Sequence, residues 1–189
     1  MIRIGIVGNI GSGKSFVANN FGYPVFNADN EVAIIYKKNK KIFVKLKKIF
    51  PKYIFKFPVN KKEISKVILV NENNLKKIVK ILHVEVRKKM NNFLRKNKFK
   101  KIVILDIPLL LENKINKKND ILVFVKAKNQ EIYKRLKKRK NFNFDLFKKF
   151  KKLQLPSDYK KKKSQFIIKN DFTKKSVKKS IKKILIKIL

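Results

Sequence analysis

The chain contains no cysteine, which excludes both a disulfide framework and a thiolate metal site. It also lacks an apolar run of about 18 residues, the length that a membrane-spanning helix needs. Apolar residues still make up 44% of the 189 residues, enough for a real core and too many for a disordered chain. Since the N-terminus enters a predicted strand at once, leaving no room for a signal peptide, we expect a soluble cytoplasmic protein.

Carboxylates are scarce, because only 12 Asp and Glu stand against 52 Lys and Arg, a net charge of +40. Such a charge is typical of proteins that bind nucleic acid or anionic membranes. However, 47 of the basic residues are Lys, spread along the chain, and residues with A- or T-rich codons are abundant, so we favour compositional bias. We therefore expect no specific nucleic-acid partner and no membrane partner. Any general base or metal-binding acid must be one of the twelve carboxylates.

Glycine is also scarce, and its placement is informative, since all five glycines lie in the first 22 residues. Residues 8–15, GNIGSGKS, fit the phosphate-loop pattern G-x-x-x-x-G-K-[ST] between a predicted buried strand at 2–7 and a predicted helix at 15–21. Backbone N–H groups of such a loop wrap phosphates, assisted by the helix N-terminus. We expect Lys14 to reach the β and γ phosphates of ATP and the Ser15 hydroxyl to ligate Mg²⁺.

Two further predicted strands end in Asp. Residues 23–28 predict a second parallel strand that ends at Asp29, and 101–106 predict a buried strand that ends at Asp106. Ligands of open α/β sheets bind at the carboxyl ends of strands, so Asp29 is a candidate catalytic group facing the γ-phosphate. The alternative is that Asp29 only caps a helix beginning near Asn30. Asp106 resembles the second nucleotide-site motif, whose carboxylate holds Mg²⁺ through water.

Residues 30–96 predict mostly helix, with a capping box at Asn60–Glu63 and a long helix from about Asn73 to Lys96. The only histidine, His83, shares a face of this helix with Arg87, four residues on. The pair either grips a phosphate or a sugar hydroxyl, or consists of a partly buried helix residue and an exposed charge.

The remaining chain continues the alternation of strands and helices. Residues 107–112 predict a loop into a short helix, and further strands are expected at 121–125 and 165–169. A helix over 129–140 carries Arg135 and Arg139, and a basic helical segment over 142–155 could form a lid that clamps the transferred phosphate. It could equally be an ordinary exposed helix. The last helix, from about Thr173, has one apolar face that we expect to pack against the sheet rather than on a membrane.

This alternation predicts an α/β, P-loop NTPase-type three-layer fold. Its mostly parallel five-stranded sheet carries helices on both faces, with a helical substrate-binding insertion and a helical lid. We expect a single domain with its core in 1–29, 98–128 and 164–189, its acceptor-binding region in 30–97 and its lid at about 129–163.

Several motifs, in order along the chain, resemble those of the dephospho-coenzyme A kinases, P-loop enzymes related to the nucleoside monophosphate kinases. The most specific is DIPLLLE at 106–112, close to a family pattern Asp-[Val/Ile]-Pro-Leu-Leu-Phe-Glu. The others are the opening residues 4–15, Asn27-Ala28-Asp29, Leu82-His83-Val84 with Arg87, Arg135-Leu136 with Arg139, Gln154-Leu155-Pro156, and Ile168-Lys169-Asn170.

The resemblance implies transfer of the γ-phosphoryl of ATP to the ribose 3′-hydroxyl of dephospho-coenzyme A, the last step of coenzyme A synthesis. It implies Asp29 as general base, and Lys14, Arg135 and Arg139 as catalytic phosphate ligands. It further implies a nucleotide site at Gly8, Gly11, Ser12, Gly13, Lys14, Ser15, Phe16 and Asn170, an acceptor site at Asp29, His83, Arg87, Asp106, Pro108, Leu109 and Glu112, and Mg²⁺ ligands at Ser15 and Asp106.

The chain departs from the family pattern at several positions. Asn27 stands in place of an Asp, which leaves Asp29 to act alone, and Val84, Phe16 and Lys169 replace Pro, Thr and Asp. Two rival functions stay open: another small-acceptor P-loop kinase, for a nucleoside or a nucleotide, and a basic nucleic-acid-binding ATPase. No D-x-x-G or N-K-x-D motif is present, which argues against a GTPase. We favour a monomer.

Overall fold

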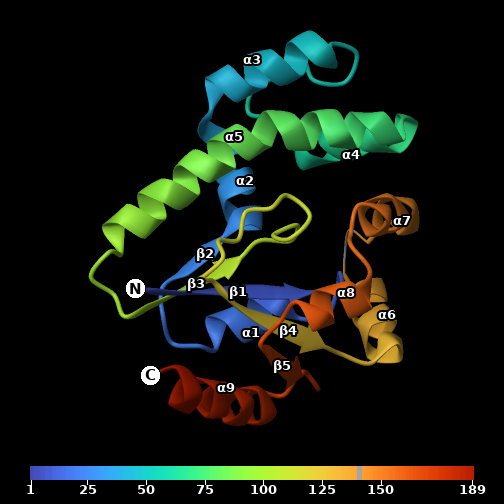
Figure 1. The fold of residues 1–189 in the computed structure, drawn as a ribbon. Helices are drawn as coiled ribbons and strands as arrows, with labels where there is room; N and C mark the ends of the chain where they lie inside the picture. Colours follow the sequence, from blue (N-terminus) through green and yellow to red (C-terminus); the bar gives the residue numbers. More distant parts are fainter. Residues whose placement is uncertain (140–141) are drawn as a thin grey trace. The chain divides into compact units, whose positions relative to one another are not determined.

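The computed structural model describes residues 1–139 and 142–189 (Figure 1). It divides into two compact units. The first contains Met1–Asn27, Asn97–Asn143 and Phe150–Leu189, and the second contains Ala28–Lys96 with Phe144–Lys149. Each unit has its own buried apolar residues and is described by itself.

A five-stranded, all-parallel sheet forms the centre of the first unit. The strands lie in the order β2-β3-β1-β4-β5, so β1, which leads into the glycine-rich segment, has a neighbour on each side. Their bounds are Ile2–Gly8 for β1, Val25–Asn27 for β2, Ile102–Asp106 for β3, Ile121–Lys126 for β4 and Phe166–Lys169 for β5. The carboxyl ends of these strands share one edge, because the strands are parallel.

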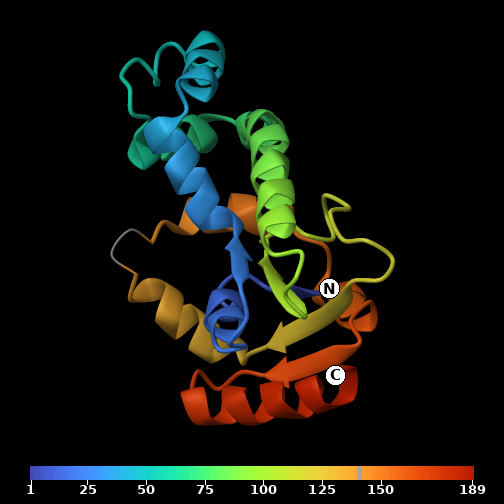
Figure 2. The same ribbon diagram turned by 90° about the vertical axis from the view of Figure 1, so that its left-hand side faces the viewer.

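One face of the sheet is covered by α1 (Lys14–Asn19) and α9 (Lys174–Ile188), and Figure 2 shows α9 running alongside β5. Alternate strand residues such as Ile4 and Ile6 point to this face, where they are fully buried with Val17 of α1 and Val177 of α9. α9 therefore packs its apolar face on the sheet, as its sequence pattern predicts. Removing these side chains from water is the main stabilising contribution here.

The opposite face of the sheet packs against the segment that follows β3 and against α8 (Ser157–Lys162). Gly5 of β1 has no room for a side chain, because a Cβ there would lie 2.9 Å from Leu122 Cδ2 and still closer to Leu110. The leucine run after Asp106 thus covers the middle of β1. α6 (Asn129–Lys137) and α7 (Phe144–Lys152) lie between β4 and α8 along the chain, and Phe144–Lys149 of α7 belongs to the second unit.

The second unit is helical. It contains α2 (Ala28–Lys38), α3 (Lys40–Ile49), α4 (Lys61–Val70) and α5 (Glu72–Lys96), and α5 contacts the other three. Apolar residues at helical spacing, such as Leu75, Ile78 and Leu82 on α5, are buried in it. The capping box predicted at the start of α4 is present, with Asn60 and Glu63 each bonded to the other's backbone. The α/β class, the parallel five-stranded sheet and the helical insertion are thus confirmed.

Several local predictions were wrong. The short helix predicted within 107–112 is absent: residues 108–114 form consecutive turns, which end at Lys114 with a left-handed φ of 49°. α2 begins at Ala28, so Asp29 lies in its first turn and is not its cap. α8 was missed, because its six residues, three of which are Lys, show no apolar period.

The helix predicted over 129–140 ends at Lys137, and its predicted end at Lys140 lies outside the described residues. Arg139 therefore lies beyond α6 and does not share a helix with Arg135. Within the described residues, no helix is long and apolar enough to cross a membrane.

Candidate active site

The segment from Gly8 to Ser15 connects the end of β1 to the start of α1 and takes the shape of a phosphate loop. Gly13 has a φ of 88°, a conformation that L-residues with a side chain rarely adopt. A Cβ at Gly13 would also overlap the Asn170 side-chain amide and lie 2.9 Å from the Phe172 ring. A side chain at Gly8 would come within 2.7 Å of the Val125 carbonyl oxygen. Both glycines are therefore required by conformation and by space.

Lys14 closes the loop. Its Nζ donates to the carbonyl oxygens of Gly8 at 3.1 Å and Asn9 at 2.9 Å. The ammonium therefore lies across the loop in which phosphates would bind. Ser12 is buried, and its Oγ has no hydrogen-bond partner among the described residues. A buried hydroxyl without a partner is costly, and an incoming phosphate oxygen would satisfy it. The residues present therefore fit a bound nucleoside triphosphate.

Asn170, the residue after β5, is hydrogen-bonded to the loop backbone. Its Nδ2 donates to the Ser12 carbonyl oxygen at 2.8 Å, and its Oδ1 accepts from the Phe172 N–H at 2.9 Å. The side chain is 4% exposed, so both bonds are protected from water. Asn170 therefore lies against the loop backbone, and the contacts of its side chain shown here are to protein groups.

Ser15 and Phe16 follow in the first turn of α1. Ser15 is exposed, so its hydroxyl is accessible to a ligand. Phe16 is partly buried and packs against the apolar core of the sheet, so its side chain is directed to the core. Any part of Phe16 in nucleotide binding would come from its backbone N–H.

Asp106 ends β3 and is 3% exposed. Asn27, at the end of β2, is its register partner, and the Asn27 side-chain amide donates to Asp106 Oδ2. Asn27, which departs from the family pattern, thus donates a hydrogen bond to the candidate metal-binding carboxylate of Asp106. An Asp at position 27 would instead place a second negative charge beside it. A carboxylate has about four lone-pair sites, so one donor leaves room for further ligands.

Asp29, His83 and Arg87 belong to the second unit. Asp29 is exposed in the first turn of α2, where its charge is stabilised by the helix dipole. His83 and Arg87 lie four residues apart on α5 as predicted. The pKa of His83 is lowered from its usual value of 6.5, first by burial and then by the Arg87 charge. Both effects favour the neutral imidazole, and the Nε2 atom is buried without a partner among the described residues.

Glu112 lies within the turns after β3, beyond Pro108 and Leu109, which are both partly buried. Its Oε1 accepts from the Leu155 N–H at 3.0 Å and lies 3.7 Å from Lys160 Nζ. The structure thus brings Glu112 together with the segment that precedes α8. Lys160 and Gln154, whose Oε1 accepts from the Ile10 N–H at 3.2 Å, were not among the predicted site residues. Nothing in the sequence distinguishes Lys160 from its neighbours at 161–163, and only the Gln154 motif pointed to this segment.

Arg135, on α6, stacks its guanidinium over the Phe172 ring at 4.1 Å from the ring centroid. Phe172 lies two residues after Asn170 and borders Gly13, so its contact with Arg135 places that guanidinium near the phosphate loop. Arg139 is exposed beyond the helix.

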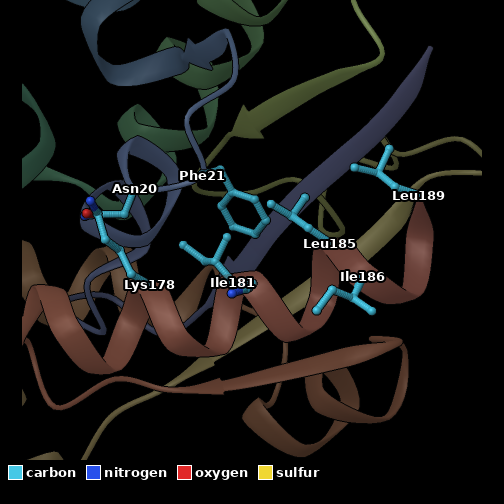
Figure 3. A pocket seen from close by; sticks show the side chains of 8 residues that line it. Asn20, Phe21, Lys178, Ile181, Leu185, Ile186 and Leu189 are labelled. Atoms are coloured by element: carbon cyan, nitrogen blue, oxygen red, sulfur yellow. The ribbon is translucent and has the colours of Figure 1, made fainter.

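A shallow groove elsewhere on the first unit contains none of the predicted site residues. It lies between the end of α1 and α9, and Figure 3 shows Phe21, Ile181 and Leu185 converging in it, with Ile186 and Leu189 at its C-terminal end. It is therefore separate from the candidate active site.

The buried strand, the loop closed by Lys14 and the following helix at the edge of a parallel sheet define a P-loop nucleotide-binding protein. A family profile described as dephospho-CoA kinase matches residues 2–176. The chain therefore belongs to the dephospho-CoA kinase family, which confirms the resemblance seen in its motifs.

Known proteins similar to the chain extend over nearly all of it. A dephospho-CoA kinase of Wolbachia pipientis wMel is 35% identical, over 96% of this chain and 95% of that protein. The crystal structure of TT1252 from Thermus thermophilus matches with a TM-score of 0.79 and 27% identity, covering 100% of this chain and 98% of that one. A dephospho-CoA kinase from Campylobacter jejuni shares the fold, with a TM-score of 0.63, 21% identity, and coverage of 98% and 96%.

Proposed function

We propose that the protein transfers the γ-phosphoryl group of ATP to the ribose 3′-hydroxyl of dephospho-coenzyme A, which makes it the last enzyme of coenzyme A synthesis. The single observation that carries this proposal is a complete phosphate loop in a chain that matches the dephospho-CoA kinase family over residues 2–176. Phosphoryl transfer depends mostly on positioning and charge neutralisation, and both are available at such a loop.

Lys14 and the loop amides are the proposed charge-neutralising groups. The Lys14 ammonium, now donating to two loop carbonyls, would turn to the β and γ phosphates with little movement of its backbone. The N–H groups at the start of α1 and the Ser12 hydroxyl would bind phosphate oxygens. Arg135 and Arg139 would add positive charge as the lid region, about 129–163, closes over the phosphates.

Asp29 is the proposed general base. It would accept the proton of the acceptor hydroxyl late in the transfer. Its exposure in the first turn of α2 allows contact with a substrate, and it is the one carboxylate of the Asn27-Ala28-Asp29 motif. His83, Arg87, Pro108, Leu109 and Glu112 are the proposed acceptor contacts, with residues 30–97 as the acceptor-binding region.

Ser15 and Asp106 are the proposed Mg²⁺ ligands. An exposed hydroxyl and a single strand-end carboxylate fit this ion, which keeps several waters and uses few protein ligands beside substrate phosphates. The described residues contain no cluster of three or more His, Cys, Asp or Glu, which suits an ion that arrives with the nucleotide. When bound, Mg²⁺ would neutralise charge on the β and γ phosphates. The Asn27 amide would orient the Asp106 carboxylate toward it.

An assay of ADP release by the purified protein tests the proposal, with ATP and Mg²⁺ present and with or without dephospho-coenzyme A. We expect turnover only with the acceptor, and a product phosphorylated at the 3′-hydroxyl by mass and NMR spectra. In parallel assays, nucleosides and nucleotides replace dephospho-coenzyme A as the acceptor, and RNA is added to test whether it stimulates ATP turnover. Equal turnover with a nucleoside, or stimulation by RNA alone, would replace the proposed function by one of its rivals.

Two finer expectations belong to the same proposal. We propose that the protein acts as a monomer, which light scattering of the purified protein checks. We also propose a cytoplasmic location, which fractionation of the source cells checks.

A further inference from the structure

The segment that precedes and enters α8 is hydrogen-bonded to the phosphate loop. Gln154 Oε1 accepts the Ile10 N–H at 3.2 Å, and Asn9 Nδ2 donates to Ser157 Oγ at 3.4 Å. The first contact joins residues that are 144 positions apart in the sequence, and the second joins residues that are 148 positions apart. The two loop residues that these contacts hold, Asn9 and Ile10, follow Gly8 directly and precede the loop amides that would bind a phosphate.

This segment is in turn held by a buried ion pair. Glu112 Oε1 accepts the Leu155 N–H at 3.0 Å and lies 3.7 Å from Lys160 Nζ, and the two side chains are 9% and 2% exposed. Burial lowers the pKa of Lys160, while the Glu112 charge opposes that shift. Glu112 thus contacts this segment twice, by a hydrogen bond at Leu155, next to Gln154, and by charge at Lys160, whose Nζ has no hydrogen-bond partner among the described residues.

A buried ion pair is poor at stabilising a fold, because the cost of removing both charges from water offsets their attraction. In other proteins, replacing a buried ion pair by apolar residues of similar volume is often neutral or stabilising. The pair is therefore better explained by the geometry it imposes on the Gln154 segment than by a gain in stability.

We propose that Lys160 is a positioning residue of the nucleotide site: through Glu112 it holds Gln154 on the Ile10 amide, which keeps the phosphate loop in its binding shape. Lys160 touches no substrate in this role. Its removal lowers the affinity for ATP while the chemical groups at Lys14 and Asp29 stay intact. The inference rests on the proposed function only in taking ATP as the ligand of the loop.

A double-mutant cycle tests the route from Lys160 to the loop. ATP affinity is measured directly by calorimetry, with Mg²⁺ and without acceptor, for the wild type, Lys160→Met, Gln154→Met and the double variant. We expect each single variant to bind ATP about 5- to 20-fold more weakly, and the double variant no more weakly than the weaker single one. Lys161→Met, in the same helix with an exposed side chain, should bind within about twofold of wild type.

Thermal unfolding of the same samples separates positioning from damage to the fold. If Lys160→Met does not fold, Glu112→Gln replaces it in the cycle, since the amide oxygen can still accept the Leu155 N–H while the charge pairing is lost. A purely structural role would lower the unfolding temperature and leave the ATP affinity of the folded fraction unchanged.

Two outcomes overturn the proposal: wild-type affinity in the Lys160 variant, or losses that multiply in the double variant. The proposed function is judged by a different readout, the ADP release that depends on acceptor. A wild-type protein that binds ATP without using dephospho-coenzyme A would fail the proposed function alone. A wild-type protein that binds no ATP would fail both.

Discussion

The phosphate loop and helix α5 carry candidate functional groups in different ways. In the loop, the groups that would meet a ligand are mostly backbone amides, and residues far along the chain hold them, as Asn170 and Gln154 do. On α5, the candidate groups are the side chains of His83 and Arg87, which share one face of the helix because they are four residues apart. A site built from backbone depends on shape and tolerates little change in it, whereas a site built from helix side chains depends on the identity of those side chains.

The largest effect is expected at the one side chain that closes the loop. Lys14→Met removes the ammonium opposite the phosphates, and we expect kcat/KM to fall by about four orders of magnitude in the coupled ADP-release assay. Lys174→Met is the matched control, since Lys174 also begins a helix, α9, and is exposed. Turnover above a tenth of wild type in Lys14→Met would show that backbone groups alone neutralise the phosphates.

Asp29→Asn tests the proposed general base, a side chain of the helical unit. We expect turnover to fall by roughly two to four orders of magnitude with ATP affinity unchanged, because a general base is lost and the phosphate loop is untouched. Glu31→Gln, in the same first turn of α2, removes an equal charge as a control. If the Asn variant keeps its turnover, Asp29 is not the base.

Gly13→Ala sharpens the role of backbone shape. The methyl group would meet Asn170 and Phe172 at a φ of 88°, so we expect ATP to bind about 10- to 100-fold more weakly in a calorimetric titration. Gly22→Ala offers a close comparison, with a φ of 77° and nothing within 4 Å of the added Cβ. It should lose about 1 kcal/mol of stability and keep its ATP affinity. Equal affinities in the two variants would contradict a loop shaped by Gly13.

The smallest effect concerns the pH dependence of stability through His83. Its pKa in the folded protein is below 6.5, so the unfolded chain binds more protons as pH falls through this range, and stability is lost on acidification. We expect the urea midpoint of the wild type to drop further between pH 8 and pH 5 than that of His83→Gln. Parallel drops in both proteins would mean that His83 titrates alike in the folded and unfolded states.

Prediction from sequence was best where the physical cause is local. The phosphate loop was found because glycine is the residue that adopts its backbone angles, and the strands were found because buried parallel strands are continuously apolar. The turns at 108–114 were mistaken for the start of a helix, since the left-handed residue that ends them, Lys114, is not a glycine. α8 was missed because packing on β1, rather than its own pattern, defines it.

By itself, the sequence determined the α/β class, the phosphate loop and the i, i+4 pair on α5, because each follows from a short-range rule of backbone angles or periodicity. Only the tertiary structure decided which of 47 lysines lies buried against Glu112, that Asn27 donates to Asp106, and that Arg135 stacks on Phe172. These contacts join residues distant in the chain. Whether a charged side chain is solvated or paired depends on its neighbours in space. Folding brings these neighbours together, and a local sequence pattern does not predict them.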